Sequence, residues 1–346
     1  MQVNKINPLS DERWVHFVDH HPKASIFHHV GWLGALQQTY GHKPYVLTTA
    51  QAGEPLKDGL VFAEVKSWLT GKRLVSLPFS DHCDILVDSE RGLEALLGEY
   101  SRYAAKFNYA EIRPLYSMTS PPSASWNMEE EYVHHSLSLE PSLDSLFSQF
   151  HKSCIQRKVK KAEKEGLHYA KGNDDTLLQQ FYKLLICTRR RHGIPPQPLQ
   201  WFRNLVSHLG DRLSIRIASQ ADRPIAAILT LSHKKTCVYK YGCSDEQFHH
   251  LGGMPFLFWK LIQECKDEQV VDLDFGRTDL TNEGLLSFKD RFGSVRTRLA
   301  YLRYPGVRKR NTSSIQTQFP VAGQIFSKLP DAISWRLGGL LYRHMG

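Results

Sequence analysis

The stretch PFLFWKLIQECKDEQVVDLDFGRTDLTNEGLLSFKDRFG, residues 255–293, decides the fold. Its first part, Pro255–Lys266, predicts a helix, because proline is favoured in a helix's first turn. The run Val270–Phe275 predicts a strand, and a second, shorter helix is predicted around 285–292. A helix, a strand and another helix in this order indicate an α/β arrangement in the C-terminal half.

The segments on both sides extend this pattern to the whole chain. The other elements predicted in the C-terminal half are helices Ser153–Glu165, Asp175–His192 and Leu199–Leu209 and strands Leu213–Ala218, Ile225–Leu231, Thr236–Gly242 and Thr297–Tyr304. Those predicted in the N-terminal half are helices Trp32–Tyr40 and Arg91–Phe107 and strands Tyr45–Ala50, Leu60–Lys66, Arg73–Leu77, Asp84–Val87, Tyr109–Arg113 and Tyr132–Leu139. Both halves follow the order helix, strands, helix, strand. The sequence therefore predicts an α/β (α+β) fold with mixed, mostly antiparallel sheets.

Length and composition indicate two globular domains. A chain of 346 residues is too long for one typical core, since a domain has about 100–200 residues. The predicted boundaries are 1–145 for an N-terminal domain, 146–305 for a C-terminal domain that holds the reaction centre, and 306–346 for a basic amphipathic tail. Hydrophobic residues at 41% and charged residues at 23% exclude wholesale disorder.

Several absences point to a cytoplasmic protein without a bound metal. No apolar run reaches the roughly 18–20 residues of a membrane span, and the N-terminal residues lack the order of a signal peptide. The six cysteines are scattered, which suggests reduced, structural thiols. Many of the histidines come as adjacent doublets whose side chains diverge, so no metal site is expected.

The formal net charge of +9 suggests an anionic partner, which can be a nucleic acid, a nucleotide-linked sugar, a phospholipid or a phosphate cofactor. Arg157 and Lys158 belong to the basic helix 153–165, whose cationic face either binds phosphate groups or is simply solvated. The tail 306–346 is also basic and amphipathic. It either lies on the anionic inner face of the membrane or packs on the core.

Five blocks of sequence carry a resemblance to a known family. They are SIFHHVGWLGALQQTYGHKPYVL (25–47), GLVFAEVKSWLTGKRLVSLPF (59–79), QRKVKKAEKEGL (156–167), FYKLLICTRRRHG (181–193) and DFGRTDLTNEGLLSFKDRFG (274–293). With these blocks the chain resembles the FemA/FemB/FemX-type proteins, which include BioF2-like and GNAT-like acetyltransferase domain proteins. The last block is the most specific.

The resemblance implies two tandem GNAT-like domains and an acyl- or aminoacyltransferase. Its characterised members transfer an amino acid from aminoacyl-tRNA to an amine of a peptidoglycan precursor, and others act in exopolysaccharide pathways. The implied partners are therefore tRNA and a nucleotide- or lipid-linked sugar or peptide acceptor. No permanently bound cofactor is expected, and aminoacyl-tRNA or acyl-CoA would serve as co-substrate. The long coiled-coil arm of some members is absent, so the reaction type is better supported than the acceptor.

Acyl transfer to an amine requires an unprotonated amine, a carbonyl within attack distance and a stabilised oxyanion. The resemblance places a functional lysine at Lys289, where a cation can hold a phosphate or the oxyanion, and the adjacent Phe288 is a candidate substrate-binding residue. A solvent-facing helical lysine is the alternative. Asp274 can accept the amine proton and Arg277 can bind a phosphate or carboxylate, or the two can simply pair and pin the loop.

Two further places are candidate binding sites. Gly252 and Gly253 precede the helix that receives the pyrophosphate in acetyl-CoA enzymes, but the surrounding HHLGGMP matches their glycine signature only in part. This mismatch leaves room for another donor, and a plain helix start explains the glycines as well. In the first domain, Lys72, Arg73 and Asp81 flank a polar loop after a strand, which either meets the acceptor or forms an ordinary turn.

Three functions remain open at this point. The first is a FemAB-like acyl- or aminoacyltransferase in cell-envelope biosynthesis, of peptidoglycan or exopolysaccharide. The second is an acetyl-CoA-dependent N-acetyltransferase of a small molecule. The third is a non-catalytic scaffold that binds anions, whose affinity would collapse with salt.

Overall fold

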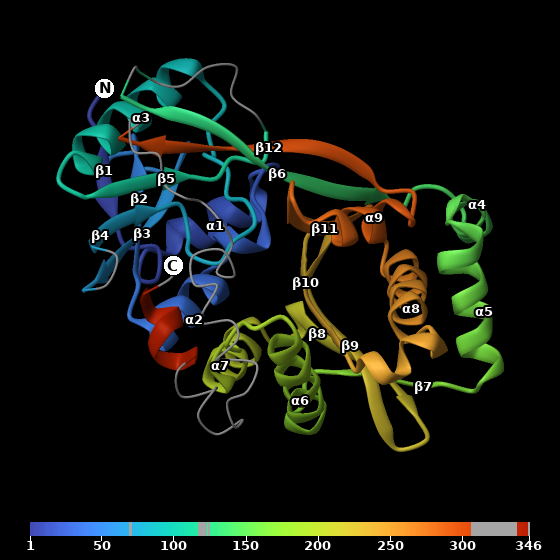
Figure 1. The fold of residues 1–346 in the computed structure, drawn as a ribbon. Helices are drawn as coiled ribbons and strands as arrows, with labels where there is room; N and C mark the ends of the chain where they lie inside the picture. The colour runs from blue at the N-terminus through green and yellow to red at the C-terminus, as the bar shows by residue number, and fades with distance from the viewer. Residues whose placement is uncertain (69–70, 117–122, 124, 306–337, 345–346) are drawn as a thin grey trace. The chain divides into compact units, whose positions relative to one another are not determined.

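The computed structural model describes residues 1–68, 71–116, 123, 125–305 and 338–344 (Figure 1). These residues form two compact units. Unit 1 holds residues 1–132 with 298–305 and 340–344, and unit 2 holds 133–297 with 338–339. Most of the predicted amphipathic tail, 306–337 and 345–346, lies outside the described residues. Among the residues that are described, every helix is too short or too polar to span a bilayer.

Unit 1 is built on a sheet with strand order β1-β2-β3-β4-β5-β12. Its elements are β1 (Asn4–Ile6), α1 (Glu12–His20), η1 (Ile26–His28), α2 (Val30–Tyr40), β2 (Lys43–Thr48), β3 (Leu60–Ser67), β4 (Gly71–Val75), α3 (Glu90–Ala104), β5 (Tyr109–Ile112), the first part of β6 (Asn127–Ser138) and most of β12 (Val295–Tyr304). Neighbouring strands are antiparallel except for β4 and β5, which are parallel and are connected through α3.

Helix α3 covers one face of this sheet, and α2 lies on the other (Figure 1). The helix begins where the Ser89 side chain accepts the backbone N–H of Gly92, which satisfies one of the free donors of the first turn. Its buried face includes Leu96 and Tyr100, which pack in one cluster with Phe62 of β3. Burial of a large side chain contributes about 1.5–3 kcal/mol relative to exposure, so this face fixes the helix on the sheet.

Unit 2 repeats the arrangement with strand order β6-β11-β10-β9-β8-β7. Its elements are α4 (Leu143–Gln149), the π-helical turn η2 (Lys152–Gln156), α5 (Arg157–Lys164), β7 (His168–Gly172), α6 (Asp175–Arg191), α7 (Leu199–Leu209), η3 (Gly210–Arg212), β8 (Leu213–Gln220), β9 (Arg223–His233), β10 (Thr236–Ser244), η4 (Glu246–Leu251), α8 (Gly253–Asp267), β11 (Asp272–Asp279) and α9 (Glu283–Asp290). The pairs β7–β8, β8–β9 and β9–β10 are antiparallel, whereas β10 and β11 are parallel.

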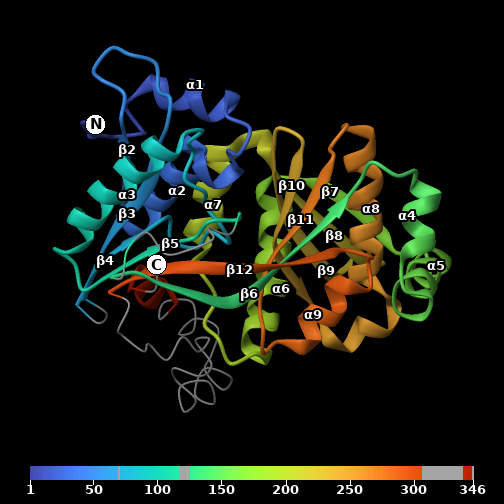
Figure 2. The same cartoon turned by 90° about the horizontal axis from the view of Figure 1, so that it is seen from above.

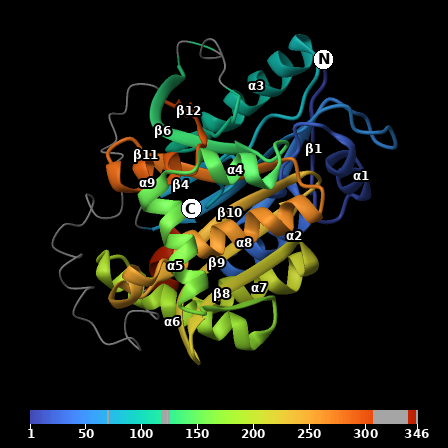
Figure 3. The same cartoon turned by 90° about the vertical axis from the view of Figure 1, so that its right-hand side faces the viewer.

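Helix α8 is the counterpart of α3, because it connects the parallel strands of its unit. It packs on strands β8–β10 with α6 on their opposite face (Figures 1 and 2), and α5 runs beside it (Figure 3). Its fully buried side chains Leu257, Phe258 and Leu261 belong to the core cluster of unit 2. Each unit thus has antiparallel strands, a crossover helix and a parallel strand, which confirms the predicted mixed, mostly antiparallel α/β fold.

The main difference from the prediction concerns Asp84–Val87, which is not a strand. Only the isolated bridges Gly59–Leu86 and Cys83–Arg113 form in or next to this run. The run is buried, but among the described residues no strand pairs with it along its length. The predicted helix Ser153–Glu165 is present, but it begins with the π-helical turn η2. Four elements were not predicted: the short elements β1, α4 and β7, and α1, whose buried Trp14, Phe17 and Val18 have helical spacing that the prediction overlooked.

Candidate functional site

A cavity of about 240 Å³ lies at the start of α8, and we call it the α8 cavity. Its floor is apolar, with Ile155, Ile225 and Phe288 among the lining side chains. Its polar groups come from several elements of unit 2 and are Cys154, Lys158, Ser244, His249 and Arg291. Two of the described lining residues are cations and none is acidic, so the cavity suits an anionic or electron-rich ligand with an apolar part.

Two glycines let the chain pass tightly at the mouth of α8. Gly252 caps the helix with φ +79°, and a Cβ there would lie 2.6 Å from the backbone oxygen of Lys158. A Cβ on Gly253 would lie 3.0 Å from the Cβ of Ala226. Gly252 is therefore required by a left-handed cap and by the close approach of α5, and Gly253 by the close approach of β9. This confinement brings the Lys158 side chain to the cavity.

The first turn of α8 offers only part of a phosphate cradle. Gly253 and Met254 occupy its first two positions, and their N–H groups lack intrahelical acceptors. Pro255 in the third position has no N–H at all. Phe256 donates to Gly252 O in the regular helical pattern. Two backbone donors match one phosphate or carboxylate group better than a pyrophosphate.

The electrostatics of the α8 cavity are cationic at neutral pH. Burial, together with the charges of Arg191 and Lys158, lowers the pKa of His249, so its imidazole is neutral. Its Nε2 lies 2.8 Å from Ser244 Oγ. The positive charge of the cavity therefore comes from Lys158 and Arg291, and the histidine and serine act as neutral hydrogen-bonding groups.

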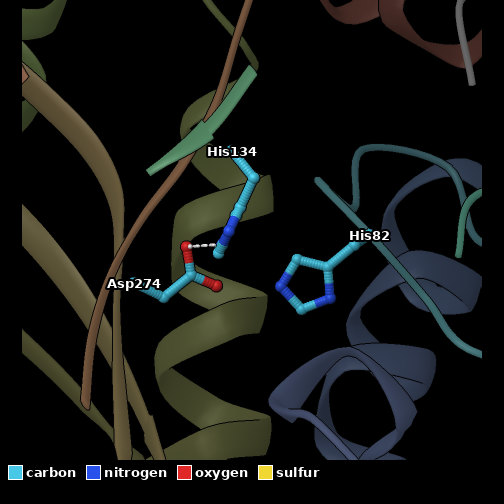
Figure 4. Close-up of side chains that lie close together, drawn as sticks. All are labelled: His82, His134 and Asp274. Carbon is cyan, nitrogen blue, oxygen red and sulfur yellow. Dashed lines mark hydrogen bonds and ion pairs between the residues drawn. The ribbon is translucent and has the colours of Figure 1, made fainter. Parts of the chain in front are cut away.

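A second cluster of unit 2 is centred on Asp274 (Figure 4). The Asp274 carboxylate is 4% exposed, and its Oδ1 accepts both from His134 Nε2 at 2.8 Å and from the Gly276 N–H at 2.6 Å. Because Nε2 of His134 carries the proton in this bond, Nδ1 is the basic nitrogen of the neutral ring. His82, also drawn in Figure 4, belongs to unit 1.

Lys289 lies beside this cluster rather than on a solvated helix face. Its side chain is 1% exposed, and Nζ donates to Gly276 O at 3.0 Å and to Arg277 O at 3.2 Å. Gly276 thus joins the two groups, since its N–H binds Asp274 and its carbonyl binds Lys289. Burial and the charge of Lys289 also lower the pKa of His135 to about 4, which keeps this neighbour of His134 neutral.

The other predicted residues of unit 2 have different surroundings. Phe288 lines the α8 cavity with Lys158, Gly252 and Gly253, so four predicted residues meet there. Arg157 is exposed on α5 and does not line the cavity. Arg277 is half-buried on β11.

The predicted residues of unit 1 do not form a cluster by themselves. Lys72 is exposed on β4, and its backbone N–H donates to Asn108 Oδ1. Arg73 is 4% exposed and donates from Nη2 to His344 O at 2.7 Å. The backbone oxygen of Asp81 accepts from the Tyr301 hydroxyl.

Sequence reasoning missed His134, Cys154, Ser244 and His249. The histidines were visible only as members of doublets, which had been used to argue against a metal. His134 and Asp274 lie 140 positions apart in sequence, and nothing local connects them. Cys154 was treated as a structural thiol, but it lines the cavity from the π-helical turn η2, a type of turn that is frequent at functional sites.

Comparisons with known proteins bear on this site. Residues 149–289 match the family model of the acetyltransferase (GNAT) domain, and every lining residue of the α8 cavity except Arg291 falls in that range. The UDP-N-acetylmuramoylpentapeptide-lysine N(6)-alanyltransferase of Weissella viridescens is 24% identical over 145 residues. That alignment covers 40% of this chain and only 42% of the relative.

Two solved structures share the fold over nearly the whole chain. FemX has a TM-score of 0.70 and 14% identity, with 94% of this chain and 100% of FemX covered. A tandem GNAT protein from the clavulanic acid biosynthesis pathway has a TM-score of 0.54 and 11% identity, with 89% and 100% covered. The expected resemblance and the tandem GNAT-like fold are thereby confirmed, and residues 149–289 match a GNAT acyltransferase domain.

Proposed function

We propose that this chain, which has the fold of FemX and a GNAT-type acyltransferase domain over residues 149–289, transfers an aminoacyl group to an amine of a cell-envelope precursor. The observation that carries the proposal is the α8 cavity, which combines cations, aromatic rings and a glycine-marked helix start inside the matched domain. We propose aminoacyl-tRNA as the donor and a nucleotide- or lipid-linked peptide as the acceptor. The name of the Weissella viridescens relative supports this choice of acceptor.

The form of the helix start supports a donor other than acyl-CoA. A pyrophosphate would use several N–H groups of the first turn, and Pro255 removes one of them. A single phosphodiester needs fewer donors and can pair with the ammonium of Lys158. The ring of Phe288 and the neutral imidazole of His249 line the same cavity, and both can stack on a base. These features together favour the 3′ end of a nucleic acid.

The chemistry proposed for the transfer is direct. The amine nitrogen attacks the ester carbonyl of the donor, a C–N bond forms, the C–O bond to the ribose breaks, and the ribose oxygen leaves with a proton. The amine must lose one proton in this exchange. We assign its acceptance to the pair of Asp274 and His134, in which the aspartate fixes the ring and Nδ1 takes the proton.

Lys289 has a positioning role in this proposal. Its ammonium holds the carbonyls of Gly276 and Arg277, and Gly276 in turn donates to Asp274. Loss of Lys289 would leave two carbonyls without this donor and loosen the turn that orients the carboxylate. Arg277 and Arg157 remain candidates for contacts with phosphate groups, as do Lys72, Arg73 and Asp81 of unit 1 for the acceptor.

The test is a transfer assay with two donors. Radiolabelled alanyl-tRNA and radiolabelled acetyl-CoA are each incubated with the purified chain and UDP-N-acetylmuramoylpentapeptide, and labelled acceptor is counted. We expect label from alanyl-tRNA only. Lys158→Ala should lower kcat/KM for the donor about 10- to 100-fold, since a hydrogen bond to a charged group contributes about 1.5–3 kcal/mol.

Lys161→Ala is the matched control. It removes the same charge from the same helix at an exposed position outside the cavity, and kcat/KM should stay within about twofold, as for most exposed sites. Transfer from acetyl-CoA alone would replace the proposal with the N-acetyltransferase function. Equal losses in the two variants would mean that donor binding depends on net charge and not on the α8 cavity, and transfer from neither donor would leave the non-catalytic scaffold.

A further inference from the structure

The tip of the β3–β4 hairpin in unit 1 exposes a large aromatic side chain between basic residues. Trp68 is 86% exposed, whereas most tryptophans of the described chain are buried. Exposure of this much apolar surface at a hairpin tip is unfavourable in water, and a partner that takes up the indole would remove the cost. The indole also carries an N–H, so it suits a boundary between apolar and polar surroundings.

Two lysines face each other directly behind this tip. The register of β3 and β4 pairs Lys66 with Lys72 and Ser67 with Gly71, and the side chains of directly opposite residues share one face of the sheet. Like charges in this position are mutually destabilising. Glu64 offsets part of the charge, because its carboxylate lies 3.9 Å from Lys66 Nζ. An anion bound at this place would offset the rest.

The last described residues of the chain lie against the same hairpin. The rings of Trp68 and His344 pack edge to face with centroids 5.5 Å apart, and Arg73 Nη2 donates to His344 O. Residues 340–344 are helical, so Leu340 and His344 share a face one turn apart. Leu340 is 66% exposed, which adds a second apolar side chain on the side of Trp68.

One side of this helical turn packs on the core of unit 1, so its other side is exposed. Tyr342 is buried and packs on Phe79 with ring centroids 5.9 Å apart. Arg343 is exposed, but its Nη2 lies toward Gly41, 3.9 Å from the position of a Cβ there. The turn thus offers Leu340, and the hairpin offers an indole together with two ammonium groups on the sheet face opposite the Arg73 side chain.

We propose that the hairpin tip, with Trp68 at its end and Lys66 and Leu340 on either side of it, here called the Trp68 patch, forms a docking surface for an anionic phospholipid bilayer. The indole and the leucine would enter the interfacial region, and the basic side chains would pair with lipid phosphates. Phosphates of RNA share the charge but not the apolar depth that two neighbouring hydrophobic side chains can use. Lys66, Trp68 and Leu340 belong to neither cluster of unit 2 and are not among the candidate acceptor contacts Lys72, Arg73 and Asp81.

Vesicle binding of the full chain tests the proposal without any substrate. The chain is sedimented with vesicles of phosphatidylcholine alone and with vesicles that contain 30% phosphatidylglycerol. We expect binding to the anionic vesicles only, weakened by high salt. Trp68→Ser should lower the partition coefficient about tenfold or more, and Lys66→Gln about fivefold, from roughly 1 kcal/mol per charge near a membrane surface.

Val295→Ser is the control, because Val295 is 64% exposed but lies in unit 2. Its binding should equal that of the wild type within about twofold. The difference in fluorescence between the wild type and Trp68→Phe gives the emission of Trp68 itself. This emission should shift to shorter wavelength when anionic vesicles are added. A structural role of Trp68 would not cause such a shift.

Three results would overturn the proposal. The chain could fail to bind anionic vesicles, Trp68→Ser could bind as well as the wild type, or the Trp68 emission could be unaffected by vesicles. Binding to single-stranded RNA that Trp68→Ser abolishes, with vesicles left unbound, would assign the Trp68 patch to nucleic acid instead. Because transfer is not measured, none of these results depends on the proposed reaction.

Discussion

Replacement of Gly252 by alanine should both destabilise unit 2 and distort the α8 cavity. The structure gives two separate costs. The residue has φ +79°, a conformation that costs an L-amino acid about 1–2 kcal/mol. The new Cβ would also lie 2.6 Å from Lys158 O, a backbone atom that cannot rotate away, and such overpacking costs about 1–3 kcal/mol. The expected loss is therefore about 2–5 kcal/mol in the free energy of unfolding.

Two other glycines separate these costs. Gly166 has φ +66° with nothing within 4 Å of a new Cβ, so Gly166→Ala should show the backbone strain alone, about 1–2 kcal/mol. Gly98 lies inside α3, also in open space and without a positive φ. Gly98→Ala should stabilise the chain by about 0.5–1 kcal/mol, because alanine is the better helix former.

Urea unfolding of the three variants measures the stabilities, and donor binding by the folded proteins measures the cavity. We expect Gly252→Ala to be the least stable and the only one with weakened donor binding, since α5 must move away from α8 to admit the methyl group. An equal loss in the free energy of unfolding for Gly252→Ala and Gly166→Ala would contradict this prediction. It is also refuted if Gly252→Ala binds the donor as tightly as the wild type.

Two further predictions concern titratable groups. Burial lowers the pKa of His28 to about 4, so as the pH falls the unfolded chain protonates this imidazole before the folded chain does. The stability of the fold should therefore fall as the pH drops from about 6.5 to 4. In the wild type, the free energy of unfolding measured with urea should rise with pH across that window. His28→Gln should reduce this slope by the equivalent of about one proton; an unchanged slope would contradict this. Asp274→Asn should lower kcat about 10²- to 10⁴-fold, the range for general acid–base catalysis, because the base His134 loses the carboxylate that fixes its ring, and should shift the acidic limb of the pH–rate profile. A lowered rate with an unmoved profile would mean that Asp274 only maintains the fold.

Most of the secondary structure could be predicted because it depends on local signals. Strands such as Leu60–Ser67 and helices such as Gly253–Asp267 have the periodicity and punctuation of their class. The run Asp84–Val87 has the same apolar character, and there the prediction of a strand was wrong. A ladder requires a partner strand, which a single sequence does not display.

The candidate site could be predicted only in part, for a related reason. Gly252 and Gly253 stand out locally, and the resemblance pointed to Phe288. The burial of Lys289 reverses the ordinary expectation for a lysine, and it depends on the carbonyls of Gly276 and Arg277. The bond between His134 and Asp274 joins distant parts of the chain. Such contacts arise from tertiary packing and leave no trace in the spacing of residues.

The central claim is that the α8 cavity holds the donor's phosphate-bearing end. A crystal structure with a stable amide analogue of the 3′-alanyl adenosine terminus of tRNA tests it most directly. The account predicts a phosphate beside the N–H groups of Gly253 and Met254 and within reach of Lys158 Nζ, with the adenine against Phe288 or His249. An analogue bound elsewhere, with the α8 cavity unfilled, would contradict it.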